Sequence, residues 1–474
     1  AEAVAKEISA CGDTFGCYPV PPFTSGSGDG HFGSESVLAF GCGSAYVKGF
    51  EKNGKLAAYP YLSNVDFLRA EEISAWLKGG LSQGIAVDSL TDVHADFARY
   101  KGVIYQKNAP PLCLGPNENL SSAMKKRAKE CACAGITAGA AFDSESVKAL
   151  NAGQLKEFAG RIEKLKFSLA EKADTEAAFS DESAKIALRA AKESVVLLKN
   201  DGLLPISPSV KNAAVIGGCA VLAGEEGLPL GVETPLERLR YEAGKKMSFR
   251  FFPCAEGSDE FEREQAIAAA ERFDITLLFV GEKDHAKMQT DKKEAFFIRK
   301  LIKTAKKAVV IFLCSPEDVS PYEEADALIV AWKPCNFTGR ALSKLLTCES
   351  PTGRLPYPII SGERAGGFYP FGYGLGYGSV EIKTAVKFGG TVEFYAENAS
   401  MEKITETVQI YRETLGGYNL AAFTKIALSP AQMRLETLKL PRGADINEKL
   451  VISSCHPSSP LARVTAVING DKTQ

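Results

Sequence analysis

Carboxylates follow two short apolar runs of this sequence. Asp88 comes directly after GIAV, residues 84–87, and Glu282 follows ITLLFVG, residues 275–281. Both runs are typical of buried strands. Barrel folds place catalytic groups at the carboxyl ends of their strands. Asp88 is therefore a candidate catalytic group, although an aspartate in this place could instead cap the next turn.

The segment after the second strand carries further titratable groups. It reads VGEKDHAKMQTDKKEAFF from Val280 and contains Glu282, His285, Lys287 and Asp291. A positioned carboxyl or imidazole could donate and later accept a proton, as general acid–base catalysis requires. Glu282 and His285 are the side chains of this segment to consider for such proton transfer. A solvated, charged loop is the alternative interpretation of the same residues.

Bulk composition excludes several classes of protein. A chain of 474 residues predicts two or three domains. Its formal net charge of −2, with scattered Lys and Arg, argues against a nucleic-acid partner. No apolar run reaches the roughly 18 residues that span a bilayer, so we expect no membrane partner. The twelve Cys lack zinc-site spacing, and we expect no metal, no cofactor and a reducing, cytoplasmic compartment.

Hydrophobic periodicity divides the chain into regions of different architecture. Helical spacing dominates residues 118–200, and strands rich in Val, Ile and Leu then alternate with helices. Such strands indicate a parallel sheet covered on both faces. Short strands punctuated by turns follow, as in a β-sandwich. We therefore predict an α/β multidomain protein divided into 1–180, 181–375 and 376–474.

Several segments in order resemble glycoside hydrolase family three. They are LRAAKESVVLLKNDGLLPI, AAVIGG, CNFTGRALSKLLTCESPTGRLPYPI, FYPFGYGLGYG and TETVQIYRE followed by AAFTKIALSPAQ. They cover roughly residues 186–432. The resemblance implies a barrel region, an α/β sandwich with a mostly parallel sheet, and a C-terminal fibronectin-III-like β-sandwich.

The resemblance also implies chemistry. Members of the family are retaining glycosidases: an aspartate on the barrel is the nucleophile, and a glutamate on a loop of the sandwich domain is the acid/base. LKGGLSQGIAVDSLTD resembles the family's nucleophile strand, with Asp88 as the matching carboxylate and a spacing from Gly84 that is one residue short. Gly281 and Glu282 match the start of the acid/base loop, and Asp291 matches its end. The implied partner is a carbohydrate such as a β-linked glucoside or oligosaccharide.

The chain departs from the family's pattern at several places. Only about 180 residues precede the α/β sandwich, whereas a complete barrel takes ~250 residues. We therefore predict a reduced, barrel-like first region that does not close with eight strands. Tyr59-Pro60-Tyr61 stands where the family has a sugar-binding Lys-His pair, and Lys287 stands where it has the catalytic Glu.

Two functional interpretations remain open at this stage. The first is a β-glucosidase-like hydrolase in which Asp88 and Glu282 carry a double displacement, with activity that could be weak. The second is a catalytically inactive relative that acts as a carbohydrate-binding or scaffold protein. We further expect the segment from Phe368 to Gly378 to be structural, and Trp332 to be a core or domain-interface residue rather than a sugar platform.

Overall fold

The computed structural model divides the chain into two compact units, Ala1–Ala184 and Lys185–Gln474. In the second unit the structure describes residues 185–469 except 222–232, 244–245, 255–257, 282–291, 363–366, 415–416 and 441–448. In the first unit it describes residues 17–19, 38, 41–42, 45–46, 48–49, 56–58, 84–87, 103–106, 120–133, 138–139, 146–170 and 181–184. Each unit is described separately below.

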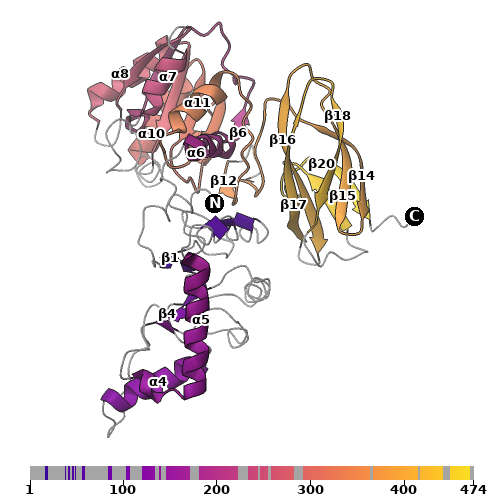
Figure 1. The fold of residues 1–474 in the computed structure, drawn as a ribbon. Helices are drawn as coiled ribbons and strands as arrows, with labels where there is room; N and C mark the ends of the chain where they lie inside the picture. The colour runs from indigo at the N-terminus through magenta and orange to yellow at the C-terminus, as the bar shows by residue number, and fades with distance from the viewer. Residues whose placement is uncertain are drawn as a thin grey trace. The chain divides into compact units, whose positions relative to one another are not determined.

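The described part of the first unit combines short parallel strands with longer helices. Strands β1 (Cys17–Pro19) and β2 (Leu56–Ala58) pair in parallel. A second parallel sheet contains β3 (Gly84–Val87), β4 (Val103–Gln106) and β5 (Ala138–Gly139). The named helical elements are α4 (Leu120–Cys133), η3 (Ser146–Ala149) and α5 (Ala152–Ala170), and Figure 1 shows α4 and α5 in purple.

The second unit is built around a six-stranded sheet in the order β6-β11-β10-β9-β7-β8. Its strands are β6 (Val196–Asn200), β7 (Asn212–Ile216), β8 (Ser248–Phe252), β9 (Ile275–Val280), β10 (Ala308–Phe312) and β11 (Ala327–Val330). All neighbours pair in parallel except β6, which is antiparallel to β11. Every residue of β9, β10 and β11 is buried, as expected for a sheet covered on both faces.

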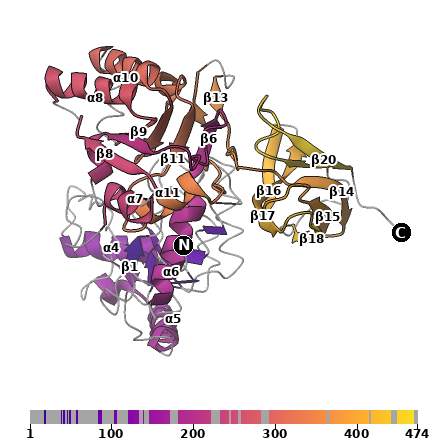
Figure 2. The ribbon, with the colours of Figure 1, turned by 90° about the horizontal axis from the view of Figure 1, so that it is seen from above.

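Helices cover both faces of this sheet. Figure 2 shows α8 (Glu260–Arg272) and α10 (Lys292–Thr304) on one side, with α7 (Pro235–Ala243) and α11 (Thr338–Thr347) on the other. The start of α7 is fixed by a reciprocal pair: Glu237 N donates to Thr234 Oγ1 (3.2 Å) and Thr234 N donates to a Glu237 carboxylate oxygen (2.8 Å). Asp259 caps α8 by accepting from Glu262 N at 2.8 Å.

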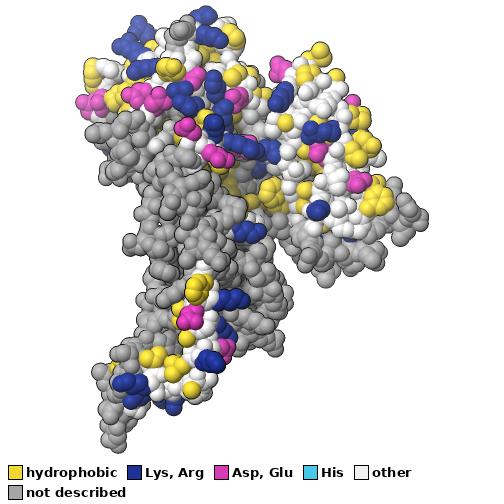
Figure 3. Space-filling view, viewed as in Figure 1, with side chains coloured by type: hydrophobic (Ala, Val, Ile, Leu, Met, Phe, Trp, Pro, Cys, Tyr) yellow, Lys and Arg dark blue, Asp and Glu magenta, His cyan; other side chains and the backbone are white. Residues whose placement is uncertain are grey.

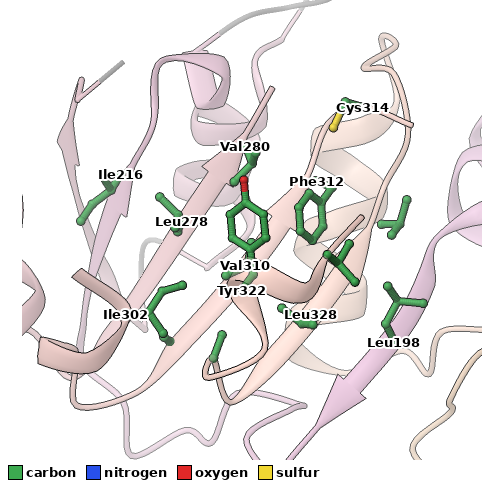
Figure 4. Close-up of a cluster of buried hydrophobic side chains, with 14 of the residues drawn as sticks. Leu198, Ile216, Leu278, Val280, Ile302, Val310, Phe312, Cys314, Tyr322 and Leu328 are labelled. Carbon is green, nitrogen blue, oxygen red and sulfur yellow. The ribbon is translucent and has the colours of Figure 1, made fainter. Parts of the chain in front are cut away.

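Two apolar clusters, one on each face of the sheet, form the core of this part. The cluster beneath α8 and α10 contains Leu278, Val310 and Phe312, and Figure 4 shows Tyr322 among them. The Phe312 and Tyr322 rings meet edge to face with centroids 4.9 Å apart. The other cluster joins the opposite side chains of the strands to Leu239 and Leu342. Short elements complete the region: η4 (Gly218–Val221), η5 (Ser320–Tyr322), and the antiparallel pair β12 (Ile359–Ile360) and β13 (Phe368–Tyr369).

The rest of the second unit is a β-sandwich of two antiparallel sheets. One sheet has the order β14-β15-β18, and the other has the order β17-β16-β19-β20. The strands are β14 (Glu381–Phe388), β15 (Thr391–Glu397), β16 (Ile404–Thr414), β17 (Gly417–Leu428), β18 (Met433–Lys439), β19 (Lys449–Ser453) and β20 (Val464–Asn469). Their inward side chains, among them Phe394, Ile410 and Ile452, form one common core.

Within the second unit, hydrogen bonds connect the β-sandwich to the α/β part. Gln409 Nε2 donates to Gly372 O (2.9 Å) and His456 N donates to Phe371 O (3.1 Å), while Gln409 Nε2 also donates to Ser454 O (2.8 Å) within the sandwich. An ion pair joins Arg354 to Glu406. Gln409 is buried, so its side-chain amide needs hydrogen-bond partners within the protein, and the carbonyl oxygens of Gly372 and Ser454 supply them.

The coarse fold prediction is confirmed, because the described chain combines a mostly parallel α/β sheet with an antiparallel β-sandwich. The division at residues 180 and 375 stays a prediction, as does the failure of the first region to close with eight strands. No helix in the described ranges is long and apolar enough to cross a bilayer.

Candidate functional site

The six-stranded sheet contains one topological switch point, between β7 and β9. From β7 the chain passes through α7 to β8 on one side, and from β9 it passes through α10 to β10 on the other. Open α/β sheets bind ligands outside the carboxyl ends of their strands at such a point. The candidate site therefore lies beyond Ile216 and Val280, the last residues of these two strands.

Backbone approaches backbone closely at this switch point. Gly217 follows β7 with φ +112°, and a Cβ at this position would lie 2.1 Å from the Phe279 carbonyl oxygen. Its N–H donates to Phe252 O at 3.3 Å, which ties the end of β7 to the end of β8. Only glycine satisfies both the conformation and the contact. The glycine that directly follows this strand in the sequence is thus required by the local backbone geometry.

The acid/base segment begins at this same edge. Gly281 follows β9 directly, so the segment that carries Glu282, His285 and Asp291 leaves the sheet at the switch point. Residues 282–291 themselves lie outside the described residues. Asp88, which follows β3 in the first unit, lies outside them too. Asp88 and Glu282 therefore stay predictions, and the separation of their carboxyls is untested.

An ion pair fixes the first turn of α10, the helix that follows residues 282–291. Arg263 on α8 donates to Glu294, in the first turn of α10, at 2.6 Å. The two side chains are 25% and 14% exposed, and the Arg263 guanidinium also lies 4.9 Å above the Phe297 ring. Burial raises the pKa of the neighbouring Cys254 thiol to about 11, with Arg263 opposing the rise. The thiol is therefore neutral at pH 7.

Trp332 follows β11 at the same edge of the sheet and has φ +62°, a strained value for a bulky residue. Its indole N–H donates to Ser194 O at 2.8 Å. Its ring meets Tyr357 edge to face at 6.0 Å and is packed against the core. These contacts agree with the expected structural role. Sequence reasoning did not predict the strained backbone, because nothing in the local pattern requires it.

The segment from Phe368 to Gly378 also has a structural role in its described contacts. Gly372 has φ +76°, and a Cβ there would lie 2.1 Å from Gln409 Oε1. The Tyr369 and Tyr373 rings stack at 5.0 Å, and Tyr377 donates its hydroxyl to Leu345 O at 2.6 Å. Burial raises the pKa of Tyr373 to about 12, so the phenol is neutral at pH 7.

Metal-ligating side chains do not gather in the part of the chain that the structure describes, since it contains no group of three or more His, Cys, Asp or Glu placed to hold an ion. The described cysteines are free thiols: Cys42, Cys219, Cys254, Cys314, Cys335, Cys348 and Cys455.

Comparison with known proteins identifies the domain that carries this edge. Residues 195–377 match the model described as the glycosyl hydrolase family 3 C-terminal domain. This segment belongs to glycosyl hydrolase family 3. The match begins at Val195, just before β6, and ends at Tyr377, so it contains the whole six-stranded sheet. The family resemblance drawn from the ordered motifs is confirmed.

Relatives and solved structures agree with this assignment. A β-xylosidase from Formosa agariphila is 26% identical over 328 residues, which cover 55% of this chain and 45% of that protein. An exo-α-(1→6)-L-arabinopyranosidase from Bifidobacterium breve is 25% identical, covering 55% of this chain and 44% of that protein. The chain thus spans less than half the length of these relatives. A β-glucosidase from Listeria innocua, solved with isofagomine, has the same fold: TM-score 0.74, 17% identity, covering 99% of this chain and 84% of that one.

Proposed function

We propose that this protein is a retaining β-glycosidase of family 3 that acts on β-linked glucosides or xylosides. The observation that carries the proposal is the position of Gly281: the predicted acid/base segment leaves a family 3 sheet at its topological switch point. The names of the similar proteins, a β-xylosidase and β-glucosidases, support this choice of substrates. A carbohydrate is accordingly the proposed ligand.

The proposed mechanism uses two carboxyls in a double displacement. The Asp88 carboxylate attacks the anomeric carbon while the Glu282 carboxylic acid protonates the departing glycosidic oxygen. The resulting glycosyl ester at Asp88 is then attacked by water, whose proton passes to the Glu282 carboxylate. Two inversions retain the anomeric configuration. The mechanism requires the two carboxyl groups to stand about 5–5.5 Å apart.

Lys287 limits the choice of acid/base. A lysine cannot protonate a leaving oxygen and then accept a proton near neutral pH unless its pKa is strongly lowered. Asp291 is the other carboxylate that matches the family's loop, and His285 is the remaining alternative. We assign the role to Glu282 because it directly follows Gly281, the residue held at the switch point.

The architecture supports two further proposals. We propose that the β-sandwich is fibronectin-III-like, since its seven antiparallel strands form sheets of three and four around one core. We also propose that residues 1–180 form a reduced barrel-like domain, followed by domains at 181–375 and 376–474. The two short parallel sheets described in the first unit are compatible with such a reduction.

A hydrolysis assay tests the function. The full chain at high concentration is expected to release nitrophenol from 4-nitrophenyl β-glucoside or β-xyloside. Asp88→Asn should lower kcat by about 10³-fold or more, and Glu282→Gln by roughly 10²–10⁴-fold for substrates with poor leaving groups. Glu271→Gln, on the exposed surface of α8, serves as the matched control. Equal rates for Asp88→Asn and the control would exclude Asp88 as nucleophile.

The alternative is a catalytically inactive relative that binds carbohydrate or acts as a scaffold. Tyr59-Pro60-Tyr61 and Lys287, in place of the family's sugar-binding and catalytic residues, favour it. The inactive relative is expected to bind oligosaccharides at equilibrium without releasing nitrophenol from any substrate of the panel. Turnover that depends on Asp88 would exclude it.

A further inference from the structure

A groove in the second unit is lined by residues other than those of the β7/β9 switch point. Its volume is about 630 Å³, within the range of sites that hold small ligands. Three separate segments line it: helix α6 (Asp181–Ser194), the end of α11 with the residues that follow it, and Lys403 with the start of β16. All of its lining residues belong to the same compact unit.

Cations outnumber acids along this groove. Its basic lining residues are Lys185, Arg189 and Lys192 on α6 and Lys403 before β16, against the acids Glu193 and Glu349. The three α6 cations recur at four- and three-residue spacing, which places them on one face of the helix. Figure 3 shows both Lys and Arg side chains, in dark blue, and Asp and Glu side chains, in magenta, on the surface around α6.

Both acids of the groove are already neutralised by ion pairs. Lys192 Nζ donates to the two carboxylate oxygens of Glu349, at 2.8 Å each. Glu193 accepts from Arg189 Nε at 2.8 Å and from Lys425 Nζ on β17, also at 2.8 Å. The acids therefore hold the walls of the groove together and do not cancel its remaining cations.

Lys185 and Lys403 are the uncompensated cations. Both are exposed, and neither has an acidic partner among the described residues. They come from different walls, one on α6 and the other at the entry to the β-sandwich. The hydroxyl-bearing residues Ser350, Thr352 and Thr405 also line the groove, and hydroxyls of this kind can bind those of a sugar ring.

We propose that this groove is a second binding site, distinct from the β7/β9 switch point, for an oligosaccharide that carries an anionic group. The anion, a carboxylate or a sulfate, binds between Lys185 and Lys403, and neutral sugar rings contact the hydroxyl-bearing residues. That the ligand is a saccharide rests on the proposed function; that it is anionic rests on the charges of the groove. The site would hold a charged substrate chain on the enzyme independently of its cleavage.

Equilibrium titration of the full chain in an Asp88→Asn background tests the proposal, because turnover is then removed while the groove is intact. The probes are trigalacturonic acid for a carboxylate, a sulfated cello-oligosaccharide for a sulfate, and cellotriose as the neutral match. At least one anionic probe is expected to bind. Its affinity should fall as the NaCl concentration rises, since exposed charges are screened over about 8 Å at 0.15 M salt.

Charge-matched double variants locate the site. The double variant Lys185→Ala with Lys403→Ala is expected to bind the anionic probe roughly tenfold more weakly, because it loses two modest surface ion pairs. Lys246→Ala with Lys300→Ala changes the net charge equally at exposed positions outside the groove and should leave the affinity unchanged. Exposed lysines can be removed without endangering the fold.

The outcomes separate this proposal from the proposed function. The proposed groove site would be excluded by any of three results: an equal loss of affinity for the anionic probe in both double variants, no binding of either anionic probe, or equally tight binding of cellotriose. The nitrophenyl glycoside rate of the otherwise unaltered enzyme should be the same with and without Lys185→Ala and Lys403→Ala. A failed hydrolysis assay would leave the groove result unaffected.

Discussion

Arg263 and Glu294 form an ion pair of 2.6 Å between the first turns of α8 and α10. They are 31 residues apart in the chain, and Glu294 lies three residues after the 282–291 segment. The pair is mostly shielded from water, and the Arg263 guanidinium rests on Phe297. It therefore holds the first turn of α10 against α8.

Removing the Glu294 charge should destabilise the second unit. Glu294→Gln leaves Arg263 partly buried without its counter-ion, and we expect a loss of about 1–2 kcal/mol in the free energy of unfolding. Urea denaturation monitored by tryptophan fluorescence measures it, with Glu271→Gln on the same helix pair as control. If both variants unfold at the same urea concentration, the ion pair contributes nothing.

Gly217 should tolerate no side chain. Gly217→Ala combines φ +112° with a contact of 2.1 Å to the Phe279 carbonyl oxygen, so the strand ends must separate. We expect a loss of about 3 kcal/mol or more, or failure to fold. Gly202→Ala is the matched control because Gly202 has φ +82° and open space around it, which predicts a cost of about 1 kcal/mol. Similar costs for the two would show that the strand ends adapt easily.

The contribution of Glu193 to the free energy of unfolding should depend on pH. Burial raises the pKa of this carboxyl, but hydrogen bonds from Arg189 and Lys425 outweigh burial and lower it below the ordinary value of 4.5. A lowered folded-state pKa stabilises the fold above pH 4.5, and this stabilisation disappears as pH falls through the folded pKa. Because Glu193 is 36% exposed, Glu193→Gln should cost no more than about 1 kcal/mol at pH 7.

Chemical denaturation at several pH values tests this linkage. The difference between wild type and Glu193→Gln should shrink steadily as the pH is lowered from 6 to 3. A constant difference over this range would mean that the charge of Glu193 is not what stabilises its contacts with α6 and β17. The Lys192–Glu349 pair is left intact in this variant.

Thiol labelling should separate the described cysteines by burial. Cys335 and Cys348 are exposed and are expected to react with iodoacetamide at pH 8. Cys455 is buried, and burial raises its pKa to about 11, so its thiolate is scarce until the pH approaches that value. Peptide mass mapping after timed labelling checks the order. Rapid labelling of Cys455 at pH 8 in the folded protein would contradict its placement.

The central strands could be predicted from the sequence because their signal is local. Continuous apolar runs such as ITLLFV and AVVIF require burial on both faces, and β9 and β10 have that burial. The change to alternating short strands predicted the β-sandwich in the same way. The edge strand β8 and the short helix α7 were missed, because Ser248–Phe252 is half exposed and becomes a strand by pairing with β7.

Tertiary structure alone decided which of these elements are neighbours. The hydrophobic pattern indicates that a strand is buried, but it does not indicate which strand lies next to it. The β7/β9 switch point and the antiparallel β6 could therefore not be predicted. Long-range pairs such as Glu193 with Lys425 have no local signature, since each residue alone is an ordinary surface charge. The sequence by itself determined the family, the apolar strands and the candidate carboxylates Asp88 and Glu282, because these depend on residue type and order. The tertiary structure determined the strand order, the close approach of Gly217 to Phe279 and the charged groove, because these depend on which distant segments share one core.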